Sequence, residues 1–260
     1  MNNPQLSIVQ SQDLLTVLVL FAAIFQIATP ILLFRKGRLN LSKNENFHDP
    51  PIVPASYAFS IWGLIYLASL AFTIYQILPQ QTYDTLLKDI RLFILISFFG
   101  TSLWLVFAKL KWVWVCFACI LIILFGLGIS FYVISFHFSD ISVKSDPTTS
   151  ETLLLIAPIS IFFGWITVAT IANLAVALKG SQIMSDGISE VIWSVILLLV
   201  ASTGACLVIY YSKGNLWYAC TILWAFFAIV IANLKKTLYK WVAITASIMI
   251  FAVISITILS

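Results

Sequence analysis

The sequence predicts an all-α polytopic membrane protein with about eight transmembrane helices, and three observations lead to this prediction. Hydrophobic residues make up 62% of the 260 residues and charged residues only 9%. A soluble globular protein has roughly a quarter of its residues charged, so this chain could not cover a water-facing surface. The mean hydropathy of +1.06 excludes intrinsic disorder, which needs low hydrophobicity. The apolar residues also gather into continuous stretches of about 20 residues, the length of a bilayer-spanning helix, whereas membrane-spanning strands would alternate over about 10 residues.

The apolar stretches follow one another with short connections. They are residues 14–34, 53–77, 92–108, 112–136, 153–178, 190–211, 216–234 and 241–259. The turn Lys109-Leu110-Lys111 makes a tight hairpin of the third and fourth stretches. The two longest loops, 35–52 and 138–151, are too short to form a domain of their own. The sequence therefore predicts one continuous membrane domain.

The basic residues of the connections predict the orientation of the chain, because cytoplasmic loops carry an excess of Lys and Arg. The connections after the first, third, fifth and seventh spans hold ten of them: Arg35, Lys36, Arg38, Lys43, Lys109, Lys111, Lys179, Lys235, Lys236 and Lys240. Those on the other side hold four: Lys88, Arg91, Lys144 and Lys213. We therefore expect both termini to lie outside the cytoplasm, and a cytoplasmic (inner) membrane as the location. The net charge of +4 records this bias, so the bilayer, and no nucleic acid, is the expected partner.

The middle of the spans lacks the residues that ion-coupled transport or catalysis would need. Ionisable side chains inside a membrane usually mark ion or proton pathways, and none lies near the middle of a predicted span. Lys111 and Glu190 lie at span ends, where long side chains can reach the interface. The two histidines, His48 and His137, are far apart in the chain and cannot build a usual metal site. With no nucleophile elbow, P-loop or dinucleotide fingerprint, the sequence predicts no catalytic residue, no metal and no required cofactor.

Aromatic, small and polar residues lie on ordered faces inside three of the spans. The candidate ligand-binding residues are Tyr57, Phe59, Trp62, Tyr66, Trp104, Trp165, Ala169 and Asn173. In the second span, Phe59, Trp62 and Tyr66 follow i, i+3, i+7 spacing and share one helix face. This face has two interpretations. It could pack against neighbouring helices, or it could line a pocket for a flat apolar ligand, to which indole and phenol rings offer π faces.

The fifth span carries a matching face. Trp165, Ala169 and Asn173 follow i, i+4, i+8 spacing, and Trp104 lies in the third span. Small and polar residues of this kind often lie between membrane helices, which is the packing interpretation. In a pocket, Asn173 would supply the one amide in an otherwise apolar wall.

Three segments resemble the translocator protein / tryptophan-rich sensory protein (TspO/MBR) family. The segment PASYAFSIWGLIY (54–66) is similar to the signature at the start of the family's second helix. The segment WITVATIAN (165–173) is similar to its Trp-x-x-x-Ala-Thr-x-x-Asn segment, and GTSLW (100–104) to its Asn-x-x-Trp. Two departures lie in the first segment, where Ala55 replaces a proline and Tyr57 replaces a tryptophan.

The resemblance implies a TspO-like five-helix bundle over residues 1–180 and an additional three-helix membrane segment over 181–260. In the family, such a bundle binds tetrapyrroles such as protoporphyrin IX, or other hydrophobic ligands, in a pocket that opens towards the first loop. The resemblance therefore implies a membrane-embedded binding or sensory protein that could translocate its ligand, with a porphyrin or lipid bound. It implies no enzyme, although the tryptophans that correspond to Trp62 and Trp165 have been linked to light-dependent porphyrin breakdown.

Several interpretations stay open beside this one. Arg35, Lys36 and Arg38 could meet porphyrin carboxylates at the mouth of the pocket, or could only face anionic lipid. The chain could instead be a facilitator or exporter of another small hydrophobic solute, which would need a polar or small-residue lining shared by the two parts. It could also be a structural subunit of a membrane complex. A homodimer is open too, unless the last three helices cover the face through which shorter relatives dimerise.

Overall fold

The computed structural model describes residues 4–34, 49–81, 84–139 and 146–260, with side chains from Leu14 onward in the first helix. Eight helices in these ranges are long and apolar enough to cross a membrane. No strand occurs in the described residues. The protein is therefore an all-α, multi-pass membrane protein, as its composition predicts.

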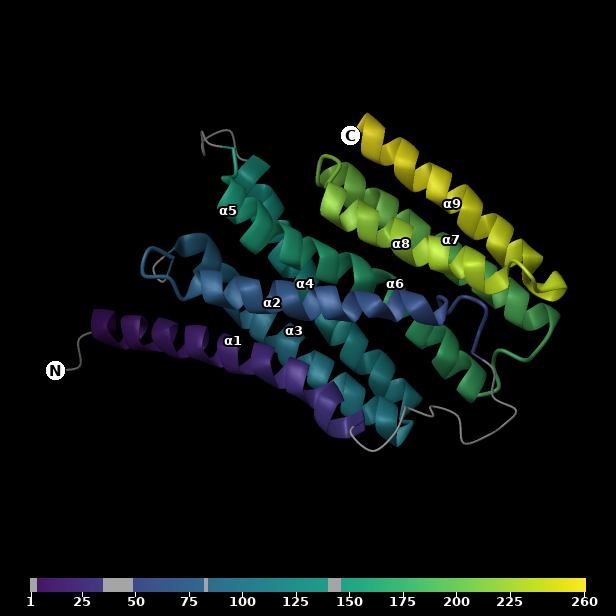
Figure 1. Cartoon of the computed structure of the whole chain (residues 1–260), viewed down its shortest axis with the longest axis horizontal. Helices are drawn as coiled ribbons and strands as arrows, with labels where there is room; N and C mark the ends of the chain where they lie inside the picture. Colours follow the sequence, from purple (N-terminus) through teal and green to yellow (C-terminus); the bar gives the residue numbers. More distant parts are fainter. Residues whose placement is uncertain (1–3, 35–48, 82–83, 140–145) are drawn as a thin grey trace.

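The helices follow one another in alternating directions (Figure 1). The elements are α1 (Pro4–Phe34), η1 (Ser56–Ser60), α2 (Ile61–Gln76), α3 (Thr85–Leu110), α4 (Val113–Ser139), α5 (Thr149–Glu151), η2 (Thr152–Ile156), α6 (Ala157–Gly180), α7 (Ile188–Tyr211), α8 (Leu216–Asn233), η3 (Thr237–Tyr239) and α9 (Lys240–Leu259). The short helix α5 and the π-helical turn η2 continue directly into α6, so these three elements form one rod.

Three of the α-helical rods begin four or more residues earlier than the apolar stretches predict: α1 at Pro4, α3 at Thr85 and the rod of α5, η2 and α6 at Thr149. In the last two rods, polar side chains cap the first turn. The Asp84 side chain caps α3 by accepting a hydrogen bond from the Leu87 N–H at 2.9 Å. Thr148 and Glu151 form a capping box at the start of α5. Capping groups are polar, so a search for apolar stretches does not detect the turns that they begin.

The directions of the helices agree with the grouping of connections that predicts the orientation. The C-terminal ends of α1, α3, α6 and α8 lie at one end of the bundle, and the C-terminal end of α9 lies at the other (Figure 1). Which end faces the cytoplasm stays a prediction. Part of its basis, Arg35, Lys36, Arg38, Lys43 and Lys144, lies outside the described residues.

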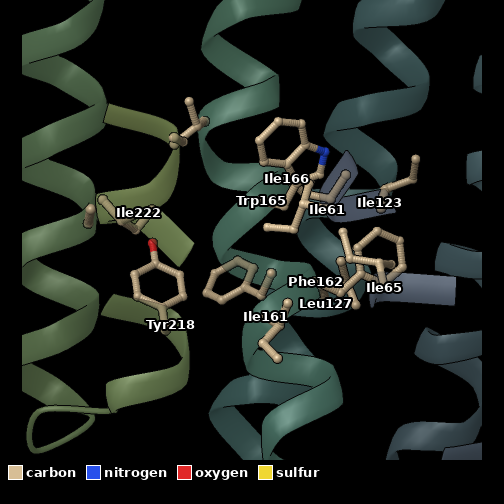
Figure 2. Packing of buried hydrophobic residues seen from close by; sticks show 14 of the residues in the cluster. Ile61, Ile65, Ile123, Leu127, Ile161, Phe162, Trp165, Ile166, Tyr218 and Ile222 are labelled. Carbon is tan, nitrogen blue, oxygen red and sulfur yellow. The ribbon is translucent and has the colours of Figure 1, made fainter. Parts of the chain in front are cut away.

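Helix α6 is the central helix of the bundle and packs against α2, α4, α7 and α8. Most of its residues are buried. Figure 2 shows Phe162 and Ile166 of α6 between Ile123 of α4 on one side and Tyr218 and Ile222 of α8 on the other. The first and second halves of the chain therefore share one hydrophobic core, which is built around α6.

Two glycines allow neighbouring helices to approach closely, as small residues do in membrane proteins. A Cβ at Gly126 of α4 would lie 2.5 Å from Ser97 Oγ and 2.8 Å from the Phe93 carbonyl oxygen of α3. A Cβ at Gly164 of α6 would lie 3.1 Å from the Tyr218 carbonyl oxygen of α8. Contact with the backbone at these points sets the spacing of the two helix pairs.

Replacing Gly126 by Ala should lower the free energy of unfolding by about 1–3 kcal/mol, the usual cost of overpacking. Gly204→Ala in α7 is the matched control, because nothing lies within 4 Å of a Cβ there. Since Ala favours a helix over Gly, the control should be as stable as the original protein or slightly more stable. Thermal unfolding in one detergent, followed by circular dichroism, measures both variants. Equal melting temperatures would contradict the close contact at Gly126.

An ionic network around the buried Glu190 joins α6, α7 and η3 at the end of the bundle where α6 ends. The Lys179 ammonium donates to Glu190 at 2.5 Å and pairs with Asp186 at 3.0 Å. The Tyr239 hydroxyl donates to the other Glu190 oxygen at 2.7 Å. Glu190 is fully buried, so the expectation that it reaches the membrane interface is wrong, because these partners hold it inside. Lys111 is exposed, as expected.

Candidate functional site

Trp62 of α2 lies at the centre of a group of aromatic side chains from η1, α2, α3 and α6. Its ring stacks on Trp104 of α3, with the centroids 5.8 Å apart and the planes 20° apart. It meets Trp165 and Phe162 edge to face, with the centroids 6.4 Å and 6.0 Å apart, and Tyr66 at a tilt of 34° with the centroids 5.6 Å apart. Such pairs stabilise a fold by about 0.5–1.5 kcal/mol each beyond the burial of their area. We call the whole group the aromatic cluster: Phe59, Trp62, Tyr66, Trp104, Phe162 and Trp165.

Asn173 connects α6 to α3 at the edge of the aromatic cluster. Its side-chain oxygen accepts a hydrogen bond from the Trp104 indole N–H at 3.0 Å. Its amide nitrogen donates to the Ala169 carbonyl oxygen of its own helix at 2.8 Å. Both hydrogen-bonding ends of the side chain are therefore used. The bond fixes the rotation of the Trp104 ring and thus the face that it presents to Trp62.

The two aromatic residues of η1 point to different neighbours. Phe59 meets Trp165 edge to face at 5.6 Å and so belongs to the aromatic cluster. Tyr57 instead meets Trp224 of α8 edge to face at 5.4 Å. The Trp224 indole N–H donates to the Ala58 carbonyl oxygen at 3.1 Å, between these two residues in the chain.

The structure therefore brings together six of the eight residues singled out in the sequence and places Tyr57 beside them. Ala169 lies one helical turn before Asn173, which bonds its carbonyl oxygen. Two further residues were not predicted. Phe162 lies three residues before Trp165, so helical spacing could have found it. Trp224 lies 166 positions after Ala58, and no local pattern in the sequence connects the two.

The aromatic cluster and Asn173 carry no charge at neutral pH, so this part of the site suits an uncharged, apolar surface. Trp165 is 2% exposed, whereas Phe59 is 41% exposed. The site is thus closed at α6 and open at η1. Among the described residues, no group of three His, Cys, Asp or Glu side chains could hold a metal ion. His48 lies outside the described residues.

Two hollows lie on the surface of the bundle. One, of about 440 Å³, lies between α4 and α7 and has Thr167 of α6 and Tyr218 of α8 in its lining. The other, of about 390 Å³, lies between α2 and α8, with Ile61, Ile161 and Trp224 in its lining. Ile61 and Ile161 directly precede Trp62 and Phe162 in the chain, so this second hollow is next to the aromatic cluster.

A family model described as TSPO-like protein matches residues 12–259. The chain belongs to the TSPO-like protein family. The match confirms the resemblance seen in the second, third and fifth spans, and it also includes the last three spanning helices of this longer chain. No curated protein and no solved structure matches the chain.

The aromatic cluster lies inside the region that the family model matches, because the residues of the cluster run from Phe59 to Trp165. The role of these residues in ligand binding stays a prediction. So does the division of the chain at residue 180. Across that division the second half packs on α6.

The hydrogen bond between Trp104 and Asn173 can be tested with a double-mutant cycle. Trp104→Phe and Asn173→Leu should each lower the free energy of unfolding by about 1 kcal/mol, the usual net contribution of one interhelical hydrogen bond. The double variant should lose less than the sum, because the second substitution removes a partner that is already unpaired. Unfolding in mixed detergent micelles measures all three variants. Strictly additive losses would show that the bond contributes nothing.

Proposed function

We propose that this membrane protein binds flat, hydrophobic ligands of the tetrapyrrole type, such as protoporphyrin IX, at the aromatic cluster. The observation that carries the proposal is the convergence of three tryptophans from α2, α3 and α6, with Trp62 between Trp104 and Trp165. Family membership supports it at the level of a TspO-type membrane protein. Sensing or translocation of the ligand would follow from this binding.

The Trp62–Trp104 stack provides the physical route to binding. The two planes are only 20° apart, so the contact is made by two nearly parallel faces on different helices. A flat ring inserted between them would replace one face contact by two. It would also remove its own apolar surface from competing lipid and solvent. A ligand without a flat face would separate Trp62 from Trp104 without forming a face contact with either ring.

Polar groups at the rim of such a ligand need partners near the aqueous end. Lys109 is a described cation near the end of α3, five residues after Trp104, and its ammonium donates to the Leu33 carbonyl oxygen at 3.0 Å. We propose that the site opens towards this end. The proposed carboxylate partners Arg35, Lys36 and Arg38 lie outside the described residues.

The remaining parts of the proposal concern the context of the site. We place the protein in a cytoplasmic (inner) membrane with both termini outside the cytoplasm, as the loop charges predict. We assign it a binding role without a catalytic residue or required cofactor, with a porphyrin or a lipid as the bound molecule. Illumination of the porphyrin-loaded protein tests for light-dependent breakdown, and mass measurement in detergent tests for a homodimer.

Titration with protoporphyrin IX, followed by quenching of tryptophan fluorescence, tests the proposed function. The Trp62→Phe/Trp165→Phe double variant should bind about tenfold more weakly, because it loses the indole faces of two ring contacts. Trp112→Phe/Trp241→Phe is the matched control, since these tryptophans are 55% and 58% exposed at span ends. Saturable quenching by the original protein and the control, weakened in the first variant, would support the site. Equal, non-saturating quenching in all three would mean partitioning into the micelle and would refute it.

One observation favours the facilitator or exporter as a second candidate function. The hollow between α4 and α7 is lined by both halves of the chain and includes two glycines, Gly128 and Gly204. Two of its three hydroxyls are bonded to each other, since Tyr218 donates to Thr167 Oγ1 at 3.1 Å, and the third belongs to the exposed Tyr132. A small hydrophobic solute would therefore meet a largely apolar lining to which both halves of the chain contribute, and this is the lining that a facilitator or exporter needs.

Efflux of a lipophilic fluorescent dye from proteoliposomes separates the two candidate functions. If the solute passes along this hollow, Gly204→Leu should fill it and slow efflux to the rate of protein-free vesicles. Gly204→Ala should leave efflux unchanged, because it adds a single methyl group in open space. Efflux that is blocked by Trp62→Phe/Trp165→Phe and unaffected by Gly204→Leu would count against this route.

A further inference from the structure

The segment that leads into α2 is irregular, although it lies directly against membrane-spanning helices. We call residues 50–59 the pre-α2 segment. They form a turn, closed by a bond from the Val53 N–H to the Pro50 carbonyl oxygen at 2.9 Å, and then lead into the start of η1. Pro51, Ile52, Pro54 and Ala58 within them are buried. Backbone N–H and C=O groups outside a regular helix need partners when protein or lipid replaces water around them. The identity of these partners shows what fixes the segment.

Helix α8 supplies these partners at three levels. The Asn233 amide nitrogen donates to the Pro51 carbonyl oxygen at 2.7 Å. The Ala228 carbonyl oxygen accepts a hydrogen bond from the Ala55 N–H at 3.2 Å. The Trp224 indole N–H donates to the Ala58 carbonyl oxygen at 3.1 Å. The pre-α2 segment is thus held along its length by one helix from the last third of the chain.

The close approach is possible because α8 presents small residues to the segment. Ala225 and Ala228 are fully buried, so no large side chain separates the two backbones there. Asn233 is fully buried as well, and its amide nitrogen also bonds to the Ile229 carbonyl oxygen at 2.8 Å. Burying an amide in a membrane helix is costly, and only its nitrogen is bonded here, because the Asn233 side-chain oxygen has no hydrogen-bond partner in the described structure. The bond to the pre-α2 segment is therefore the interhelical contact that the buried amide provides.

The bonds fix the residues of the segment that reach the aromatic cluster. Ala58 lies between Tyr57 and Phe59, so the Trp224–Ala58 bond sets the direction in which both side chains leave the backbone. Tyr57 then contacts Trp224 at 5.4 Å, and Phe59 contacts Trp165 at 5.6 Å. Phe59 is the exposed edge of the cluster, so its position sets the width of the open side.

We propose that α8 belongs to the ligand site, with Trp224 and Asn233 as positioning residues that hold the pre-α2 segment so that Phe59 closes over Trp165. This inference rests on the proposed function, since it assigns a role in retaining the flat ligand. It gives the last three helices a part in binding: α8 fixes the open side of the site. The experiment therefore needs one measurement that involves a ligand and one that does not.

The variants are Trp224→Phe, which keeps a ring and removes the N–H donor, and Asn233→Leu, which removes the amide. Trp217→Phe is the matched control, because Trp217 lies on the same face of α8, seven residues before Trp224, and is 37% exposed against 38% for Trp224. Hydrogen–deuterium exchange of residues 50–59 without ligand reports whether the segment is held. Protoporphyrin IX affinity and dissociation rate report whether holding it matters for binding, and the melting temperature reports folding.

Both variants should speed exchange in the pre-α2 segment, with melting temperatures close to that of the control. Protoporphyrin IX should bind about fivefold more weakly, the factor to which the net contribution of one hydrogen bond corresponds, mainly through faster dissociation. Trp217→Phe should change neither quantity. If Asn233→Leu does not fold, Trp224→Phe decides alone, because it keeps an aromatic ring at the position.

Two results would overturn the inference. Unchanged exchange would show that α8 does not hold the segment. Faster exchange with unchanged affinity and dissociation would show that α8 only anchors the chain, while the proposed function stands. Absence of saturable binding by the original protein is a different result: it refutes the proposed function and the ligand role of α8 with it. The exchange measurement still decides whether Trp224 and Asn233 fix the segment.

Discussion

The burial of α6 on nearly all sides is the constraint on which the rest of the structure depends. In a bilayer, apolar surface alone does not drive helices together, because lipid tails are as apolar as the side chains that they would replace. A central helix must therefore be held by close packing and hydrogen bonds. On α6, Gly164 provides close packing towards α8, the Thr167–Tyr218 bond lies nearby, and Asn173 bonds Trp104 of α3. The same helix carries Trp165 of the aromatic cluster. Packing and candidate site are thus built on one element.

This arrangement joins the two halves of the chain physically. The first half contributes the rings around Trp62, and the second half contributes α8, which bonds the backbone just before α2. At the C-terminal end of α6, Lys179, Glu190 and Tyr239 link α6, α7 and η3 through polar contacts. A shift of α7–α9 relative to α6 would therefore strain bonds at both places. The shape of the site and the position of the last three helices are for this reason properties of one packed unit.

The parts of the molecule that follow from local composition could be predicted, and the parts that depend on distant contacts could not. Spans are selected by apolar length, and helix faces by spacing, so the eight helices and the alignment of Phe59, Trp62 and Tyr66 are readable from the sequence. Arg91 shows the limit. Its charge suggests a loop at the aqueous boundary, yet it is fully buried and its guanidinium donates to the Gln81 carbonyl oxygen at 3.2 Å. The contacts of Glu190 and Trp224 could not be predicted from the sequence either, because their partners lie on other helical elements.

The geometry of the rings also bears on which ligands the site would discriminate. Each ring of the aromatic cluster already has aromatic neighbours, so binding must exchange existing face and edge contacts for new ones. Aromatic contacts are directional, and a guest regains them only if it offers a flat face at the angle that the rings require. Lipid chains, which are present in large excess, have no such face and would leave the separated rings without compensation. Selectivity against lipid would then come from the stability of the Trp62–Trp104 stack itself. The stronger that contact is, the more completely a guest must reproduce it, and under the proposed function a rigid planar macrocycle would do so with both of its faces.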